Sequence, residues 1–171
     1  IWDQVNDQRF LAYALKVVGD DNTVYLKKPM SSSELGQSIR SAEAFLNRME
    51  AYALSGEEGL ALAELNAFRK TRVIGYTDVN LSGQTLLDEI RLERRKELCF
   101  EGHRWFDLRR QGMPEIKHTY KAEKGGAVYE YVLQQGDPMY TLPFPNSVVL
   151  QNRALVQNPS REMGARQGEI Q

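Results

Sequence analysis

The stretch from Glu93 to Arg110, ERRKELCFEGHRWFDLRR, constrains the fold of this chain more than any other. Its charged residues recur at spacings of three and four, which bring opposite charges together on one side of a helix. Its apolar residues are too numerous for an exposed helix: Leu98, Phe100, Trp105, Phe106 and Leu108. We therefore predict a helical segment that packs into a larger body, with its charges paired and with Trp105 and Phe106 in the core.

Composition limits the class of protein. The 171 residues are 42% hydrophobic and 26% charged, which is typical of one globular domain with a real core. The net charge of -1 gives no basic field for phosphate backbones, so we expect no nucleic acid partner. No run approaches the ~20 apolar residues of a membrane helix. The first residues, Ile1-Trp2-Asp3, resemble the middle of a longer sequence, so we expect this chain to be the C-terminal portion of a longer protein.

The pattern of apolar residues and turn signals predicts the order of the elements. Residues 1–36 are predicted to form an extended lead-in with short strands, and residues 37–74 a pair of helices. Residues 84–112 are predicted to form a long helix with a break at Gly102. In the last part, 117–171, Val128–Leu133 alternates as a strand that should return through a turn to pair with Met139–Leu142, followed by an irregular C-terminal wrap.

The predicted helix pair resembles one tetratricopeptide repeat. Phe45, Tyr52, Gly56 and Ala61 stand where that 34-residue pattern has a large aromatic, a tyrosine, the turn glycine and a small residue. One repeat cannot bury both of its faces, so we expect further repeats upstream. The predicted fold is therefore mainly α, a tetratricopeptide-like scaffold with a small β-hairpin and an irregular C-terminal segment.

One cluster has the residue types of a metal or acid–base site. Glu97 and Glu101, and His103 and Asp107, are each one helical turn apart. Arginines at compatible spacing explain the same residues as a buried network of ion pairs, and we favour that interpretation: Arg94, Arg95 and Arg104. The sequence contains none of the common catalytic motifs, so we expect no catalytic residue, no metal, no cofactor and no enzyme activity.

Two segments together resemble the C-terminal signature of the SusD/RagB family. They are the Glu93–Arg110 stretch and YTLPFPNSVVLQNRALVQNP at Tyr140–Pro159, and the helix pair from Ser41 to Arg72 is similar to the family's last helical repeat. The chain departs from the pattern at Phe144, where isoleucine is usual, at Val148 or Val149, where glutamate is common, and after Pro159, where a glycine and an aromatic residue are missing.

The resemblance implies a function in nutrient uptake. SusD-like proteins are lipoproteins on the outer-membrane surface of Bacteroidetes, which bind glycans for polysaccharide utilisation and cover a SusC-like TonB-dependent transporter. It implies a lipid anchor N-terminal to this chain as the only attachment to the membrane. It also implies that much of the glycan site lies upstream of this segment. The alternative is a tetratricopeptide-like adaptor whose helix pair binds a peptide and no sugar.

Sugar binding needs aromatic rings that stack on pyranose faces, and polar groups that meet the hydroxyls. Five aromatic residues lie on or near predicted loops and strands and are the candidates, although packing is the commoner role of such residues: Trp2, Tyr25, Tyr76, Tyr129 and Tyr131.

Overall fold

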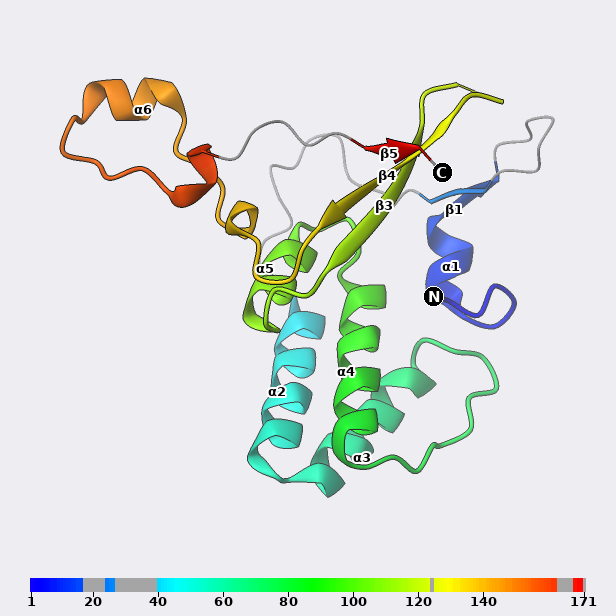
Figure 1. The fold of residues 1–171 in the computed structure, drawn as a ribbon. Coiled ribbons are helices and arrows are strands. Elements are labelled where there is room, and N and C mark those ends of the chain that lie inside the picture. The colour runs from blue at the N-terminus through cyan, green and yellow to red at the C-terminus, as the bar shows by residue number, and fades with distance from the viewer. Residues whose placement is uncertain (17–23, 27–39, 124, 163–167, 171) are drawn as a thin grey trace. The chain divides into compact units, whose positions relative to one another are not determined.

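Helices dominate the first part of the chain and a small sheet the second (Figure 1). The computed structural model describes residues 1–16, 24–26, 40–123, 125–162 and 168–170. These residues fall into two units, Ile1–Arg104 and Trp105–Gln171. The prediction of a mainly α fold with a small β addition is confirmed. Within the described residues, no helix has the length and apolarity needed to cross a membrane.

The helix pair of the first unit consists of α2 (Ser41–Ser55) and α3 (Glu58–Lys70). Ala42, Leu46 and Met49 are buried at helical spacing on α2, and α3 meets them with Ala61 and Leu65. Gly56 ends α2 with φ of 86°, a left-handed conformation that suits glycine. Ser33 and Ser38, whose hydroxyls are of the kind that cap helices, precede this helix in the sequence but lie outside the described residues.

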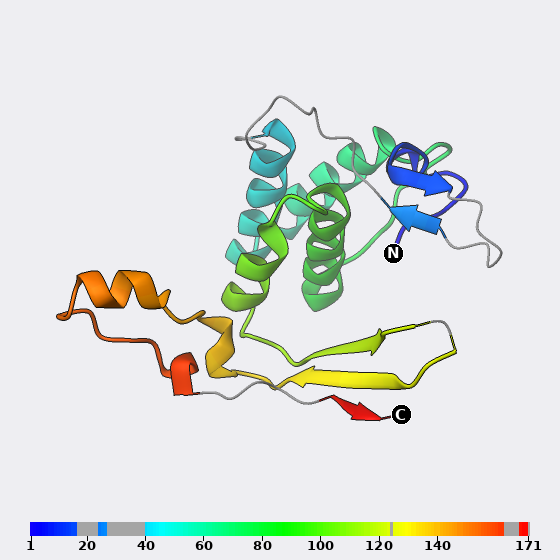
Figure 2. The same cartoon turned by 90° about the horizontal axis from the view of Figure 1, so that it is seen from above.

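Helix α4 (Gly83–Glu97) packs against both helices of the pair, and Leu86 and Ile90 complete the core (Figure 2). The predicted break is present, because α4 ends at Glu97 and α5 (His103–Arg110) begins after Gly102, whose φ is 81°. Three apolar residues of this stretch are not among the buried core residues: Phe100, Trp105 and Phe106.

Phe100 and Phe106 correct the sequence prediction. Phe100 is 56% exposed and has φ of 63°, so it lies in the turn between α4 and α5 and not on a helical stripe. Phe106 is 66% exposed, since the short helix α5 buries one side only and Asp107 and Leu108 occupy it. Trp105 is half-buried and stacks on Tyr140, with ring centroids 5.0 Å apart. Cys99, which lies between Leu98 and Phe100, is only partly buried.

The N-terminal segment differs from the extended lead-in predicted for 1–36. It contains a helix, α1 (Gln8–Tyr13), before two short antiparallel strands, β1 (Ala14–Lys16) and β2 (Val24–Leu26). Asp7 forms an isolated bridge with Val73, and the Gln8 N–H donates to the Arg72 carbonyl at 2.9 Å. These backbone contacts join the segment to the end of the helix pair.

The sheet of the second unit has the order β3-β4-β5 and is antiparallel throughout. Its strands are β3 (Ile116–Lys121), β4 (Val128–Leu133) and β5 (Glu169–Ile170). The hairpin was predicted, but its pairing was wrong, because β4 pairs with β3 and not with Met139–Leu142. The later segment forms η1 (Pro138–Tyr140) instead, where Tyr140 is buried against Trp105 and donates its hydroxyl to the Pro114 carbonyl.

The rest of the second unit is an irregular arm with two short helical turns, α6 (Asn146–Gln151) and η2 (Pro159–Glu162). Both views show α6 away from the strands of its unit (Figures 1 and 2). The side-chain amide of Gln157 joins the two ends of this arm. Its oxygen accepts from the Phe144 N–H at 2.8 Å, and its nitrogen donates to the Phe144 carbonyl at 3.1 Å. Asn158 and Ser160 donate to the carbonyls of Leu142 and Thr141.

Candidate functional site

Glu93 and Glu97 of α4 lie at the centre of a buried network of ion pairs. Their side chains are 1% and 2% exposed. Arg9 Nη1 lies 2.7 Å from Glu93 Oε1 and 3.3 Å from Glu97 Oε2. Glu93 Oε2 also accepts from Arg69 Nε at 2.8 Å. Glu97 accepts from Arg40 Nη2 at 2.8 Å and from Arg72 Nε at 3.0 Å.

This network accounts for the acidic cluster that the sequence offers as a metal or acid–base site. Burial acts to raise the pKa of Glu97, but hydrogen bonds and charge from Arg72, with Arg9 and Arg40, outweigh it and lower that pKa. Glu97 is therefore held as a carboxylate. A carboxylate fully engaged by guanidinium groups is a poor proton donor, which fits a structural role better than a catalytic one.

The other members of that cluster are distributed among separate partners. Glu101 binds Arg40, His103 Nδ1 lies 3.7 Å from a Glu43 carboxylate oxygen, and Asp107 accepts from Arg110 Nε at 3.1 Å. Within the described part of the chain, no group of three or more His, Cys, Asp and Glu side chains is arranged to hold a metal ion. Ion pairing was predicted from Arg94, Arg95 and Arg104, and Glu97 also has partners from distant segments that the sequence did not indicate: Arg9, Arg40 and Arg72.

A groove between α2 and α3 is a second feature of the first unit. Its cavity volume is about 380 Å³, and it is lined by apolar side chains and a polar rim: Ala42, Phe45, Met49, Ala67 and Phe68, with Ser41, Arg48, Glu64, Thr71 and Arg72. The Arg48 guanidinium lies 5.0 Å from the centre of the Phe45 ring, and that ring is half-exposed. Such a groove has the size and the apolar lining of a ligand or peptide site.

Three of the five candidate aromatic residues do not form a common site in the described structure. Trp2 is half-buried, and its Nε1–H has no hydrogen-bond partner among the described residues. Tyr76 is half-buried and donates its hydroxyl to Asn66 Oδ1 at 2.8 Å, which gives it a role in holding the loop after α3. Tyr25 belongs to β2, but its side chain lies outside the described part of the structure.

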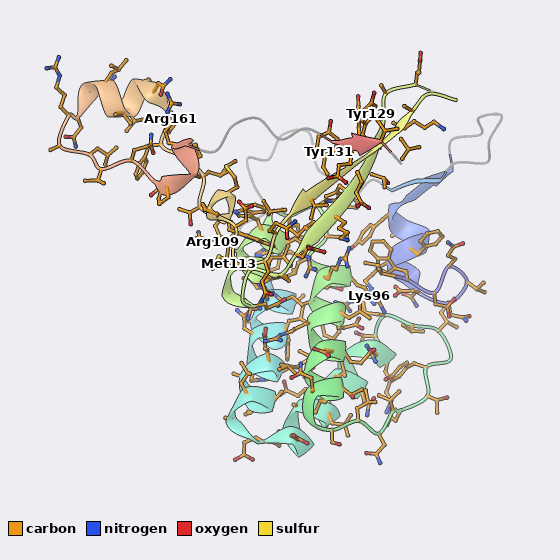
Figure 3. All side chains as sticks on the ribbon, viewed as in Figure 1. Lys96, Arg109, Met113, Tyr129, Tyr131 and Arg161 are labelled. Carbon is orange, nitrogen blue, oxygen red and sulfur yellow. The ribbon has the colours of Figure 1, made fainter. Side chains whose placement is uncertain are left out.

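The structure brings the other two, Tyr129 and Tyr131, together on β4 (Figure 3). Alternate residues of a strand project to the same side of a sheet, and directly paired residues of antiparallel strands also share a side. The register pairs Tyr129 with Tyr120 and Tyr131 with His118. We call this set of four residues the tyrosine face: His118, Tyr120, Tyr129 and Tyr131.

The tyrosine face is open toward β3 and supported toward β5. Tyr120 is 56% exposed and His118 is exposed, whereas Tyr129 and Tyr131 are half-buried. A methyl group added to Gly168, just before β5, would lie 2.8 Å from Cβ of Tyr129 and from ring carbons of Tyr131. The glycine therefore allows the chain to lie against the Tyr131 ring, which leaves that ring little freedom to turn.

The sequence did not identify His118, Tyr120 or Gly168 as members of a site. The alternation of Ile116, His118 and Tyr120 could have indicated strand β3. The lysines between and after them, Lys117 and Lys121, gave the segment the composition of a surface loop. No local signal marks Gly168, because its neighbours Tyr129 and Tyr131 are distant in sequence.

A comparison with protein-family models shows which family the chain belongs to. A model described as the SusD family matches residues 9–160. The chain belongs to the SusD family. No curated protein matches this sequence.

Solved structures of SusD relatives resemble the chain. A SusD superfamily protein from Bacteroides fragilis is 29% identical with a TM-score of 0.65, and the match covers 86% of this chain and 33% of that one. A SusD-like protein from Bacteroides fragilis NCTC 9343 is 26% identical with a TM-score of 0.53, covering 71% of this chain and 25% of that one. A SusD-like carbohydrate binding protein from Bacteroides vulgatus shares the fold at 22% identity, with a TM-score of 0.56 and coverage of 88% and 38%. The chain thus spans 25% to 38% of the length of these solved relatives.

Proposed function

We propose that this chain is part of a protein that binds polysaccharides or oligosaccharides at the bacterial cell surface. The match of the SusD family over residues 9–160 is the observation that carries the proposal. One solved relative that shares the fold is described as a carbohydrate binding protein. The tyrosine face supplies, within the second unit, the clustered rings that sugar binding requires.

The proposed role is capture and transfer of glycan without catalysis. The carboxylates of Glu93 and Glu97 are ion-paired in the interior of the first unit, so they support packing and do not offer an acid–base pair to a glycan. In this proposal the captured glycan passes to a SusC-like TonB-dependent transporter in the outer membrane. A lipid anchor N-terminal to this chain would hold the protein at the surface.

Calorimetric titration with oligosaccharides tests the binding function. The probes are neutral hexasaccharides of glucose, xylose and mannose, and a sulfated oligosaccharide of similar length. We expect saturable heat of binding with at least one probe. The titrations use the full-length protein, because part of the glycan site is expected upstream of this segment. The absence of binding to every probe would contradict the proposal, and a thermal unfolding transition measured on the same sample establishes that the protein is folded.

The groove between α2 and α3 favours a second candidate function, a protein-interaction adaptor. An amphipathic helix could place an apolar ridge against Phe45 and Met49, beside the Arg48–Glu64 ion pair. A pull-down with the purified chain tests this alternative. Recovery of a peptide ligand that Phe45→Ala abolishes, with no heat from any sugar, would favour the adaptor over glycan binding.

A further inference from the structure

We propose that the tyrosine face of the β3-β4-β5 sheet is a binding site for a neutral oligosaccharide. This inference rests on the proposed glycan-binding function, and it adds a location and a class of ligand. It also adds Tyr120 and His118 to the two candidates that the sequence offers. Four observations support it: the placement of the rings, the separation of charge between the two faces, the support behind Tyr131, and the polar groups at the ring edges.

The register places the four side chains in a compact patch. His118 pairs with Tyr131, and Tyr120 with Tyr129, two residues further along each strand. Neighbouring strands lie about 4.8 Å apart, and alternate residues about 7 Å apart along a strand. Aromatic side chains at this spacing form a nearly continuous apolar surface, on which the faces of consecutive pyranose rings can stack.

Charge is separated between the two faces of the sheet. The residues that alternate with the tyrosine face include the charged side chains of β3 and β4: Lys117, Lys121 and Glu130. Among the described residues of the three strands, the side with the tyrosines also includes Ile116, Leu133 and Ile170 and has no Lys, Arg, Asp or Glu. A face without fixed charge complements a neutral sugar better than a sulfated or uronic acid polymer, whose anionic groups would lack partners there.

Gly168 supports the Tyr131 ring of the tyrosine face from one side. Because a Cβ at this position would lie 2.8 Å from the Tyr131 ring, only a glycine lets the backbone approach the ring so closely. A ring held from one side loses little conformational entropy when a sugar stacks on the other side. Tyr120 is more exposed than Tyr131 and is therefore the ring most accessible to a ligand.

The edges of the rings supply polar groups that an apolar patch alone would lack. Phenolic hydroxyls both donate and accept hydrogen bonds, and an imidazole offers two nitrogen atoms. Tyr120, Tyr129 and Tyr131 therefore combine a stacking surface with groups that reach sugar hydroxyls, and His118 stands beside them. This combination distinguishes the tyrosine face from an ordinary apolar protein-docking patch.

Calorimetry with the neutral hexasaccharide that binds most tightly tests the site. Tyr120→Ala should raise its Kd about tenfold, which corresponds to about 1.4 kcal/mol, near the upper value for an aromatic contact. Tyr131→Phe keeps the ring and should raise Kd only about threefold, through loss of a hydrogen bond. Gly168→Ala keeps all the rings and should still weaken binding several-fold, because the Tyr131 ring must move.

The matched control is Thr119→Ala, an exposed change on the opposite face of the same strand, which should leave Kd unchanged. If a neutral hexasaccharide binds and Tyr120→Ala and Gly168→Ala both bind it like the unaltered chain, the tyrosine face is not the site, although the glycan-binding function stands. Tighter binding of the sulfated oligosaccharide would overturn the assignment to neutral sugars. If no probe binds, the function itself fails and the site with it.

Discussion

At the scale of single residues, Glu97 has the most consequential environment in the chain. Its carboxylate is paired with arginines of three different segments: Arg9 in α1, Arg40 before α2 and Arg72 after α3. A carboxylate removed from water is tolerated only when such partners offset the loss of hydration. Glu97 therefore fixes the N-terminal segment and the helix pair to α4 in one arrangement.

Substitution of Glu97 tests the importance of this network. Glu97→Gln keeps the shape of the side chain but removes the buried carboxylate that Arg9, Arg40 and Arg72 share, so we expect the free energy of unfolding to fall by about 3–5 kcal/mol. The measurement is urea denaturation at pH 7. Glu64→Gln is the matched control, because its partner Arg48 is 50% exposed and such a pair contributes about 0–1 kcal/mol. A loss for Glu97→Gln no larger than that of the control would contradict the network interpretation.

The same residue predicts a dependence of stability on pH. Burial acts to raise the folded-state pKa of Glu97, but the hydrogen bond and charge of Arg72, with the charges of Arg9 and Arg40, outweigh it. That pKa is therefore lowered below its ordinary value of 4.5. A lowered carboxyl pKa contributes stability that is fully present above the unfolded value and is lost as the pH falls through the folded value. We expect the difference in unfolding free energy between the unaltered chain and Glu97→Gln to shrink from pH 7 to about pH 3. A difference that stays constant would show that the charge of Glu97 is not responsible.

At the scale of elements, the end of α2 depends on backbone conformation more than on side chains. Gly56 has φ of 86°, and the Glu57 N–H that follows donates to the Tyr52 carbonyl at 2.9 Å. This is the usual arrangement in which a left-handed residue closes a helix and turns the chain toward the next one. The sharp turn between α2 and α3 therefore requires glycine at this position.

Alanine at two glycines of this hairpin should have different effects. Gly56→Ala should lower the free energy of unfolding by about 1–2 kcal/mol, because a side chain is strained in the left-handed conformation. Gly59→Ala, in the first turn of α3, meets no atom within 4 Å and has no positive φ, so stability should be unchanged or should rise by up to about 1 kcal/mol. Thermal unfolding of both variants provides the comparison, and equal losses would contradict the argument.

Helices whose apolar residues recur at a regular spacing could be predicted from the sequence, because that spacing indicates that one side of the helix is buried. Ala42, Leu46 and Met49 marked α2, and Gly102 marked the break before α5. Phe100 and Phe106 were misplaced, since the number of apolar residues does not reveal that a turn or a short helix leaves some of them outside.

Contacts between distant segments could not be predicted in this way. Arg9 and Glu97 are 88 residues apart, and helical spacing reports only charges within the same helix. The partner of β4 was also predicted wrongly, because turn residues occur on both sides of that strand and the lysines of β3 obscured its alternation. The tyrosine face depends on this pairing, so the sequence offered Tyr129 and Tyr131 without showing that Tyr120 joins them.

At the scale of the whole molecule, the two units differ in how they are stabilised. All nine members of the buried hydrophobic cluster found among the described residues belong to Ile1–Arg104. In Trp105–Gln171 the buried hydrophobic residues of the described part are Leu108 and Tyr140. Strand pairing holds β3, β4 and β5 together, and hydrogen bonds of Gln157, Asn158 and Ser160 hold the segment that follows η1. A small buried apolar area stabilises a fold less than a continuous core, because the hydrophobic contribution scales with that area.

We therefore expect the second unit to unfold at a lower urea concentration than the first. The chain has two tryptophans, Trp2 in the first unit and Trp105 in the second, so Trp105→Phe and Trp2→Phe each leave one fluorescent probe. The signal of Trp105 should change at the lower midpoint. Adding Glu97→Gln to each variant should lower the midpoint reported by Trp2 and leave that reported by Trp105 in place, because Glu97 has its ion pairs within the first unit. Coincident midpoints that shift together would instead show one cooperative transition for the whole chain.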